Sequence, residues 1–296
     1  MTRNERRNLR NGLLFIAPWI VGFLVFTLYP ICSSLFFSFC DYSVLERPVW
    51  VGTENYTELA RDDVFWISLK NTAYYAVFAL LFGLILSISI ALLLNSKVRG
   101  MAFYRTIFFL PSIVPAVASA FLWMWIYNPD YGLANAILAI FGLPPQKWLF
   151  DEDMAKPSFI FMGLWGLGAS MLIFLAQLQH VPESLHEAAM IDGASNLDRF
   201  RLITIPMISP VIFFNLVVGI IGSFQIFTTA FIATQGGPNN ATLFYVLHLY
   251  NNGFQFLHMG YASALAWVLF TIILVFTGLQ LRLANRWVYY EGEARR

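Results

Sequence analysis

The chain has 296 residues, of which 58% are hydrophobic and only 12% are charged, against roughly 25% charged residues in an ordinary soluble domain. A soluble globule of this size cannot bury that much apolar surface, so the composition excludes a soluble enzyme, a nucleic-acid-binding protein and a disordered chain. The formal net charge is +1, and the placement of the charges is more informative than their sum. Cys32 and Cys40 are too few for a disulfide scaffold or a Cys-based zinc site. At helical spacing they lie about 12 Å apart, too far for a disulfide.

Long runs without Asp, Glu, Lys or Arg mark the membrane spans, because a bilayer-spanning helix needs about 20 mostly apolar residues. These runs cover residues 13–39, 71–96, 106–129, 157–182 and 202–281. The last run is too long for one helix and contains the turn-forming segment Gln235-Gly236-Gly237-Pro238-Asn239-Asn240. We therefore divide it into spans at about 207–233 and 260–281. The sequence predicts an all-α integral membrane protein with six transmembrane helices. The first run is longer than the apolar core of a signal peptide, so we expect it to be retained.

The basic residues predict the orientation, because Lys and Arg accumulate on the cytoplasmic side of a membrane protein. Thirteen of them fall on one side of the six spans: Arg3, Arg6, Arg7, Arg10, Lys97, Arg99, Arg105, Arg199, Arg201, Arg282, Arg286, Arg295 and Arg296. The other side has ten of the 17 acids and only five bases: Arg47, Arg61, Lys70, Lys147 and Lys156. This asymmetry predicts that both termini are cytoplasmic. In the long outer connection at about 128–156, the short apolar stretch 133–141 favours a helix lying in the membrane interface.

The span centres contain no Asp, Glu, Lys or Arg. A proton-coupled carrier needs a titrating group near the middle of the membrane, so this class is disfavoured, whereas sodium coupling through backbone carbonyls stays open. None of the four lysines follows a glycine, so the chain lacks the Gly-Lys-Ser/Thr of a phosphate-binding loop. Active transport by this chain would therefore draw its energy from a partner.

The loop between spans four and five, residues 181–206, is too apolar for a solvated linker and too charged for a span. Pro182 and Glu183 suit the first turn of a helix, and Gly193 can end that helix in the left-handed conformation. Ser195 with Asp198 can cap the next helix. We expect a short helix, a sharp turn and a second helix that enters span five.

Glu187, Ala188 and Ala189 lie on the first of these helices. The two alanines allow another protein surface to approach closely, and Glu187 offers a carboxylate beside them. The alternative is an amphipathic helix resting on lipid, which the four acids and two bases of the loop fit poorly.

The loop resembles the EAA loop of ABC importer permeases, whose pattern is Glu-Ala-Ala, three residues, Gly, nine residues, Ile, one residue and Leu-Pro. The matching positions are Glu187, Ala188, Ala189, Gly193, Ile203, Ile205 and Pro206, with Ile205 in place of Leu. Over roughly residues 10–290, further segments resemble the carbohydrate-uptake branch that includes the maltose and glycerol-phosphate permeases. They include Leu110-Pro111, Trp123-Met124-Trp125, Asn128-Pro129, Trp148-Leu149, Ile191-Asp192-Gly193-Ala194, Gly236-Gly237-Pro238 and Gly260-Tyr261-Ala262.

The resemblance implies a non-catalytic permease subunit of a type I importer in the cytoplasmic (inner) membrane of a bacterium or archaeon. Its partners would be a second related permease, two ATP-binding subunits and an extracytoplasmic solute-binding protein. ATP would be bound by the partner subunits only, and this chain would need no cofactor and no metal. The residues coupling the chain to the ATPase would be Glu187, Ala188, Ala189, Asp192, Gly193, Ile203 and Pro206.

The resemblance also implies three parts of the chain. Residues 1–68 would hold the cytoplasmic N-terminus, the first span, which would wrap the partner permease, and an outer loop. Residues 69–281 would form the type I (MetI-like) transmembrane domain of spans two to six, with the coupling loop at 181–206. Residues 282–296 would be a cytoplasmic tail.

A sugar or oligosaccharide is the expected solute. Its path needs uncharged polar groups and aromatic rings, and spans four and five supply Trp165, Ser170, Ser223, Gln225 and Thr228. An unpaired glutamine facing lipid is costly, so Gln225 must face protein or an aqueous cavity. A hydrogen bond to a helix of the partner permease is the alternative role for Gln225. A stand-alone carrier or channel, and a permease for glycerol phosphate or another polyol, stay open as alternative functions.

Overall fold

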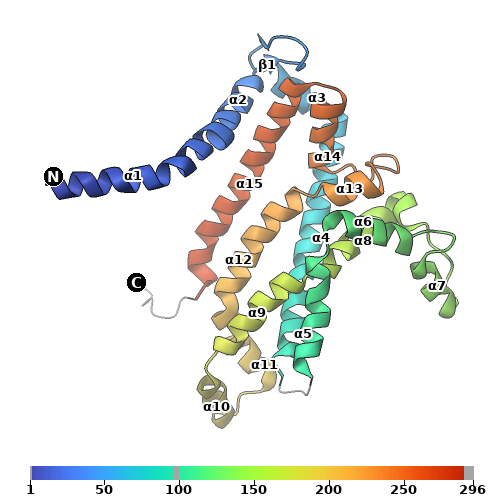
Figure 1. Ribbon diagram of the computed structural model, residues 1–296. Coiled ribbons are helices and arrows are strands. Elements are labelled where there is room, and N and C mark those ends of the chain that lie inside the picture. The colour runs from blue at the N-terminus through green and yellow to red at the C-terminus, as the bar shows by residue number, and fades with distance from the viewer. Residues whose placement is uncertain (1, 97–99, 290–296) are drawn as a thin grey trace. The chain divides into compact units, whose positions relative to one another are not determined.

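The computed structural model (Figure 1) describes residues 2–96 and 100–289. Lys97, Arg99, Arg295 and Arg296, which contribute to the predicted orientation, and residues 290–296 of the predicted tail lie outside this described part. The chain divides into two compact units. The first contains Met1–Asp62 and Leu249–Phe270, and the second contains Asp63–His248 and Thr271–Arg296.

The first unit begins with a long apolar helix. Helix α1 (Arg3–Phe23) continues through a π-helical turn, η1 (Leu24–Leu28), into α2 (Tyr29–Phe37). Strand β1 (Cys40–Asp41) then pairs antiparallel with β2 (Val49–Trp50), and α3 (Glu54–Arg61) follows. The amide of Asn55 donates to the carbonyls of Ser38 at 3.0 Å and Cys40 at 2.9 Å, and so ties α3 to the end of α2 and the hairpin.

The second unit is built around α4 (Asp63–Leu94), which packs against α8 (Glu152–Trp165), α9 (Gly168–His180) and α12 (Ile205–Phe224). Helix α4 begins eight residues before the charge-free run that starts at residue 71, and α8 begins five residues before the run that starts at residue 157. Charged residues such as Asp63 and Glu152 occupy their first turns, where a carboxylate complements the helix dipole. Charge-free runs therefore mark the apolar part of a helix and underestimate its length.

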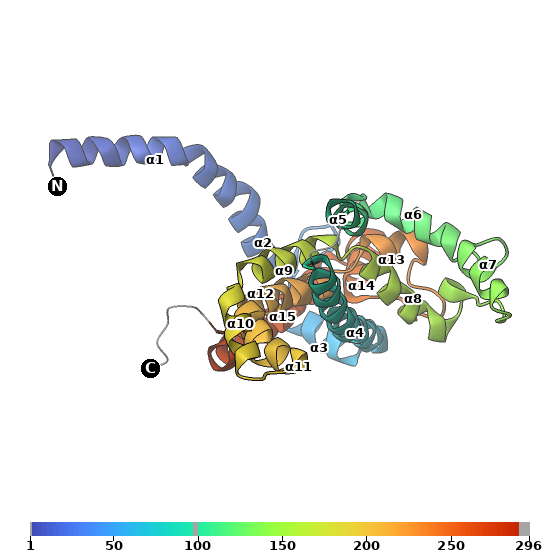
Figure 2. The same cartoon turned by 90° about the horizontal axis from the view of Figure 1, so that it is seen from below.

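Two of the predicted spans are bent. Helix α5 (Met101–Phe109) and the 3₁₀ turn η2 (Leu110–Ile113) meet α6 (Ala116–Ile126) at 100°, a bend visible in Figure 2. Pro115 pushes Val114 into an extended conformation, so the run 106–129, predicted as one span, is formed by two helices joined at a bend. Helices α8 and α9 meet at 49°. Helix α9 passes directly against α5 at its first residue, Gly168. Only glycine fits there, because a Cβ would lie 2.7 Å from the Cα of Phe109.

The predicted fifth span is interrupted. Helix α12 ends at Phe224, and after a break at Gln225–Phe227 the short α13 (Thr228–Ala233) follows. The predicted turn at 235–240 is confirmed, because Gln235, Asn239 and Asn240 all adopt a left-handed backbone conformation. Asn71 of α4 fixes this turn by donating to the carbonyls of Asn240 at 2.7 Å and Leu243 at 3.2 Å.

The remaining elements complete the chain. They are α7 (Leu133–Ile140), the 3₁₀ turn η3 (Trp148–Phe150), α10 (Glu183–Ile191), α11 (Asn196–Arg199), the π-helical turns η4 (Phe200–Thr204) and η5 (Asn251–Gln255), α14 (Tyr245–Tyr250) and α15 (Met259–Trp287). Four helical segments of the described chain are long and apolar enough to cross a bilayer, and the count rises to six if each bent pair is one span.

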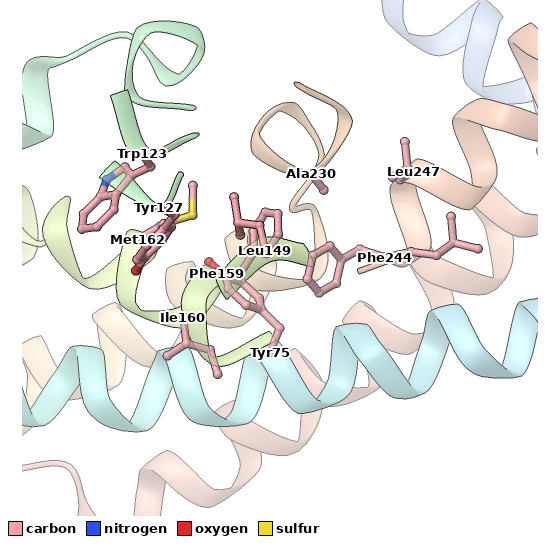
Figure 3. Close-up of a cluster of buried hydrophobic side chains, with 11 residues drawn as sticks. Tyr75, Trp123, Tyr127, Leu149, Phe159, Ile160, Met162, Ala230, Phe244 and Leu247 are labelled. Carbon is pink, nitrogen blue, oxygen red and sulfur yellow. The ribbon is translucent and has the colours of Figure 1, made fainter. Parts of the chain in front are cut away.

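Two apolar clusters within the described residues help to hold the second unit together. The first gathers aromatic rings from α4, α6, α8 and the segment after α13, including Tyr75, Trp123, Phe159 and Phe244 (Figure 3). The rings of Phe159 and Phe244 meet edge to face at 5.5 Å, a geometry that adds attraction beyond burial alone. The second cluster joins α4, α9 and α12 through residues such as Ala91, Phe174 and Ile208.

Asn135 organises the connection between α6 and α8. The apolar stretch predicted to be helical is confirmed as α7. Asn135 lies on this helix, and its side-chain NH₂ group donates to the carbonyls of Pro129 and Gln146, both at 2.9 Å. Its side-chain oxygen accepts from the backbone N–H of Gln146 at 3.0 Å and from the indole N–H of Trp148 at 2.8 Å. All of its hydrogen-bonding capacity is used within one connection.

We predict that Asn135→Ala loosens residues 128–150. Two donors and two acceptors lose their partners, which lowers the free energy of local unfolding by on the order of 2 kcal/mol. Amide hydrogen exchange of this segment in the detergent-solubilised protein measures the change. Gln146→Ala is the control, because the Gln146 side chain makes one exposed hydrogen bond, to the Pro144 carbonyl. Equal exchange in the two variants would contradict the prediction.

Candidate functional site

The loop between α9 and α12 contains a short helix held by its own sequence. Pro182 precedes α10 in an extended conformation, and Glu183 lies in the first turn. At the other end, the N–H of Ala194 donates to the carbonyl of Ala189 at 2.9 Å, and the N–H of Gly193 donates to that of Met190 at 3.1 Å. This pair of bonds is the Schellman motif, which requires a left-handed residue after the helix. Gly193 supplies it with φ of +81°.

A second cap follows at once. The Ser195 hydroxyl accepts from the N–H of Asp198 at 3.2 Å, and the Asp198 carboxylate accepts from the N–H and the hydroxyl of Ser195 at 3.1 and 2.6 Å. This capping box starts α11, as predicted. The bonds donated by the Ser195 hydroxyl and backbone lower the pKa of Asp198 below its usual value. Helix α11 then passes through η4 into α12 without a break.

The side chains of α10 are turned outward. None of its residues is buried, and Ile191 is 88% exposed. Leu185 and Met190 are exposed as well, so α10 exposes three large apolar side chains. Behind it lies a cleft of about 640 Å³ between the ends of α4, α9, α10 and α11, with Glu187 and Arg199 in its lining.

The predicted coupling residues lie in two neighbouring parts of the loop between α9 and α12. Glu187, Ala188, Ala189, Asp192 and Gly193 lie on α10 or in the turn that ends it. Ile203 lies in η4 and Pro206 in the first turn of α12. The seven residues therefore follow one continuous segment, from the exposed helix to the start of the long helix.

The predicted solute-path residues are only partly brought together. Ser170 of α9 and Ser223 of α12 line the same cavity of about 170 Å³. Trp165, the last residue of α8, packs edge to face on Trp123 at 5.9 Å. Gln225 is exposed directly after α12, and Thr228 begins α13. These three residues do not line the cavity of Ser170 and Ser223.

Sequence reasoning missed three polar groups of that cavity. Tyr75 and Ser87 of α4 and Asn215 of α12 belong to its lining. Ser87 and Asn215 stand as small polar residues inside otherwise apolar runs, and this was the signal that could have identified them. No three His, Cys, Asp or Glu side chains of the described chain are grouped to hold a metal ion.

Comparisons with known proteins place the chain in a family. Residues 72–289 match the family described as binding-protein-dependent transport system inner membrane component. The chain is 40% identical to the probable ABC transporter permease protein YesP of Bacillus subtilis, over 99% of this chain and 96% of that protein. It is 35% identical to the arabinooligosaccharides transport system permease protein AraP of the same species, over 95% of this chain and 89% of that one.

A solved structure shares the fold. The match is to a chain in the crystal structure of a bacterial alginate ABC transporter in complex with an alginate pentasaccharide-bound periplasmic protein. Its TM-score is 0.82 at 24% identity, over 96% of this chain and 98% of that one. With the apolar helices and the exposed α10, these matches show that the chain belongs to the family of binding-protein-dependent transport system inner membrane components, the membrane-embedded permeases of ABC transporters.

Proposed function

We propose that this permease forms part of the translocation path for a sugar or oligosaccharide, in the cytoplasmic membrane of a bacterium or archaeon. In this proposal the chain has six spans, with each bent pair counted as one, and spans two to six form a MetI-like core. The arabinooligosaccharide relative and the alginate-transporter fold support a carbohydrate. The family match favours an ABC permease over a stand-alone carrier or channel. The lack of Lys and Arg in the span centres disfavours a glycerol-phosphate solute.

The partners follow from the same proposal. A second related permease would complete the path, two ATP-binding subunits would bind and hydrolyse the ATP, and a solute-binding protein would deliver the solute from outside. The coupling role is supported by the structure of α10, which is an exposed helix with two alanines beside the carboxylate of Glu187. Capping hydrogen bonds on both sides of Gly193 hold the turn that ends this helix. We assign contact with an ATP-binding subunit to Glu187, Ala188, Ala189 and Asp192, and transmission to Gly193, Ile203 and Pro206.

We assign the solute path to Trp165, Ser170, Ser223, Gln225 and Thr228. The break after α12 supports this assignment, because non-helical backbone at membrane depth is tolerated only where protein or a water-filled cavity covers it. Gln225 lies at this break and is exposed. Interrupted helices are also where membrane transporters commonly place their solute sites.

Gly193→Val should abolish coupling. A Cβ at Gly193 meets no atom within 4 Å, but the φ of +81° disfavours every L side chain and a β-branched one most. Holding valine in this conformation costs on the order of 1–3 kcal/mol of backbone strain, so we expect the turn to change shape. Solute uptake in whole cells should then fall at least tenfold, with the subunit still inserted in the membrane at the normal level.

Gly193→Asn is the matched control, because asparagine tolerates the left-handed conformation better than other non-glycine residues. Uptake by this variant should stay within about twofold of the unsubstituted protein. Normal uptake by Gly193→Val would remove the proposed role of the turn.

Gln225→Leu should reduce solute uptake and leave both complex assembly and basal ATP hydrolysis largely intact, because it removes an amide that contacts solute hydroxyls. Gln255→Leu, at an exposed glutamine of η5, is the control and should leave uptake unchanged. If Gln225→Leu instead makes the two permeases separate in detergent without a solute-specific defect, Gln225 is an interface residue.

The orientation is tested by thiol labelling. Glu152 and Glu187 are both exposed, so differences in labelling report the side of the membrane. After replacing Cys32 and Cys40 with serine, Glu152→Cys should react with a membrane-impermeant thiol reagent added outside intact cells. In cells that lack the ATP-binding subunits, which would otherwise cover this position, Glu187→Cys should react only after the cells are permeabilised. Labelling of Glu187→Cys from outside would overturn the orientation.

A further inference from the structure

A row of arginines lies on one face of α1, just before the apolar part of the first candidate span (blue in Figure 1). At the helical repeat, an arc of about 100° around the helix axis contains Arg3, Arg6, Arg7 and Arg10. Over the next two turns the same arc contains Leu14 and Ala17. One side of the helix is therefore basic at its start and apolar further along.

The positive charge of this face is not neutralised within the described part of the chain. All four arginine side chains are exposed, and none has a hydrogen-bond or ion-pair partner among the described residues. The one acid within residues 1–40 is Glu5, which lies on roughly the opposite side of the helix. Its carboxylate accepts from the backbone N–H of Thr2 at 2.8 Å. Since like charges three and four residues apart destabilise a helix, an anion bound between the arginines would stabilise α1.

The level of these arginines along the helix matches the headgroup layer of a bilayer. Residues 13–39 contain no charged side chain. Arg10 and Arg7 precede this run by about 5 and 9 Å along the helix axis, and a headgroup layer is roughly 5–8 Å thick on each side of the hydrocarbon. Long arginine side chains can extend further toward the phosphates. A basic cluster directly beside a span attracts anionic lipids.

The shape of this face fits a lipid better than a free anion. A shallow groove begins at Arg6 and Arg10 and continues along apolar side chains: Leu9, Leu13, Leu14 and Ala17. A guanidinium group binds phosphate through two parallel N–H···O bonds, and the apolar part of the groove can hold a hydrocarbon chain. A phospholipid offers both parts in this order, with its phosphate at the membrane surface and its acyl chains alongside the span.

We propose that the arginine face of α1, formed by Arg3, Arg6, Arg7 and Arg10, binds the headgroup phosphate of an anionic phospholipid. An acyl chain of this lipid follows the groove toward Ala17. The bound phosphate offsets the repulsion between the arginines and fixes the depth at which the first span begins. The proposal concerns lipid only, so it holds or fails independently of the solute and of the ATP-binding subunits.

Native mass spectrometry of the full chain in a neutral detergent measures the lipid binding directly. The protein is titrated with phosphatidylglycerol and, separately, with phosphatidylcholine that has the same acyl chains, so that only the headgroup differs. We expect the first phosphatidylglycerol to bind at least tenfold more tightly than the first phosphatidylcholine. Replacing the four residues together should reduce this preference at least fivefold, in a variant with Arg3→Gln, Arg6→Gln, Arg7→Gln and Arg10→Gln.

A second variant separates the arginine face from basic charge in general. It moves two arginines by one position each while keeping the composition and the net charge, through Arg7→Asn, Asn8→Arg, Arg10→Asn and Asn11→Arg. The four arginines then spread over an arc of about 200°, and the preference for phosphatidylglycerol should fall at least threefold. Equal affinities of the unsubstituted chain for the two lipids, or an undiminished preference in either variant, would overturn the proposal.

Discussion

The structure depends on one constraint: a chain that crosses hydrocarbon must satisfy every backbone N–H and C=O within the protein, because the bilayer core offers no water. Helix α4 meets this constraint by running unbroken from Asp63 to Leu94. The bend between α8 and α9 and the break after α12 do not meet it within their own helices. Both are covered by the first apolar cluster instead: Trp165 at the end of α8 and Ile226 and Phe227 in the break pack against it. The aromatic core is therefore also the seal over the interrupted backbone.

The parts of the fold that sequence predicted are those determined by local chemistry. Charge-free runs located the spanning helices, since a charged side chain in the bilayer is costly, and the α10–α11 turn followed from Gly193, Ser195 and Asp198 alone. The interruptions were harder to predict. Pro115 was visible as a breaker, but the 100° bend reflects how α5 and α6 pack within the fold. Gly166 and Gly168 stand at the bend between α8 and α9 and were a breaker signal that the prediction did not use, whereas Gln225 is not a breaker and its local sequence does not mark the break.

The candidate site shows the same division. Ser170 and Ser223 were predicted separately as uncharged polar residues, and the packing of α9 on α12 brings them to one cavity. Ser87 and Asn215 were missed because a small polar residue in an apolar helix ordinarily satisfies itself on the preceding turn, as Asn215 does by donating to the carbonyl of Val211 at 2.9 Å. Ser87 differs only in lacking such a bond, and this difference exists only in the packed structure. Polarity can be read from sequence, whereas an unmet hydrogen bond cannot.

The geometry of α12 links the two predicted sites. Helix α10 has no buried side chain, so a displacement of α10 passes along the backbone, through the paired caps around Gly193 and the helical segment of α11 and η4. That segment continues into α12, whose 20 residues extend about 30 Å. Helix α12 packs on α4 and α9, and its far end is Phe224, next to Gln225. The segment 187–206 and the polar residues Ser223 and Gln225 therefore lie toward opposite ends of α12. In the proposed coupling, a movement of α10 reaches the break at Gln225–Phe227 through α12.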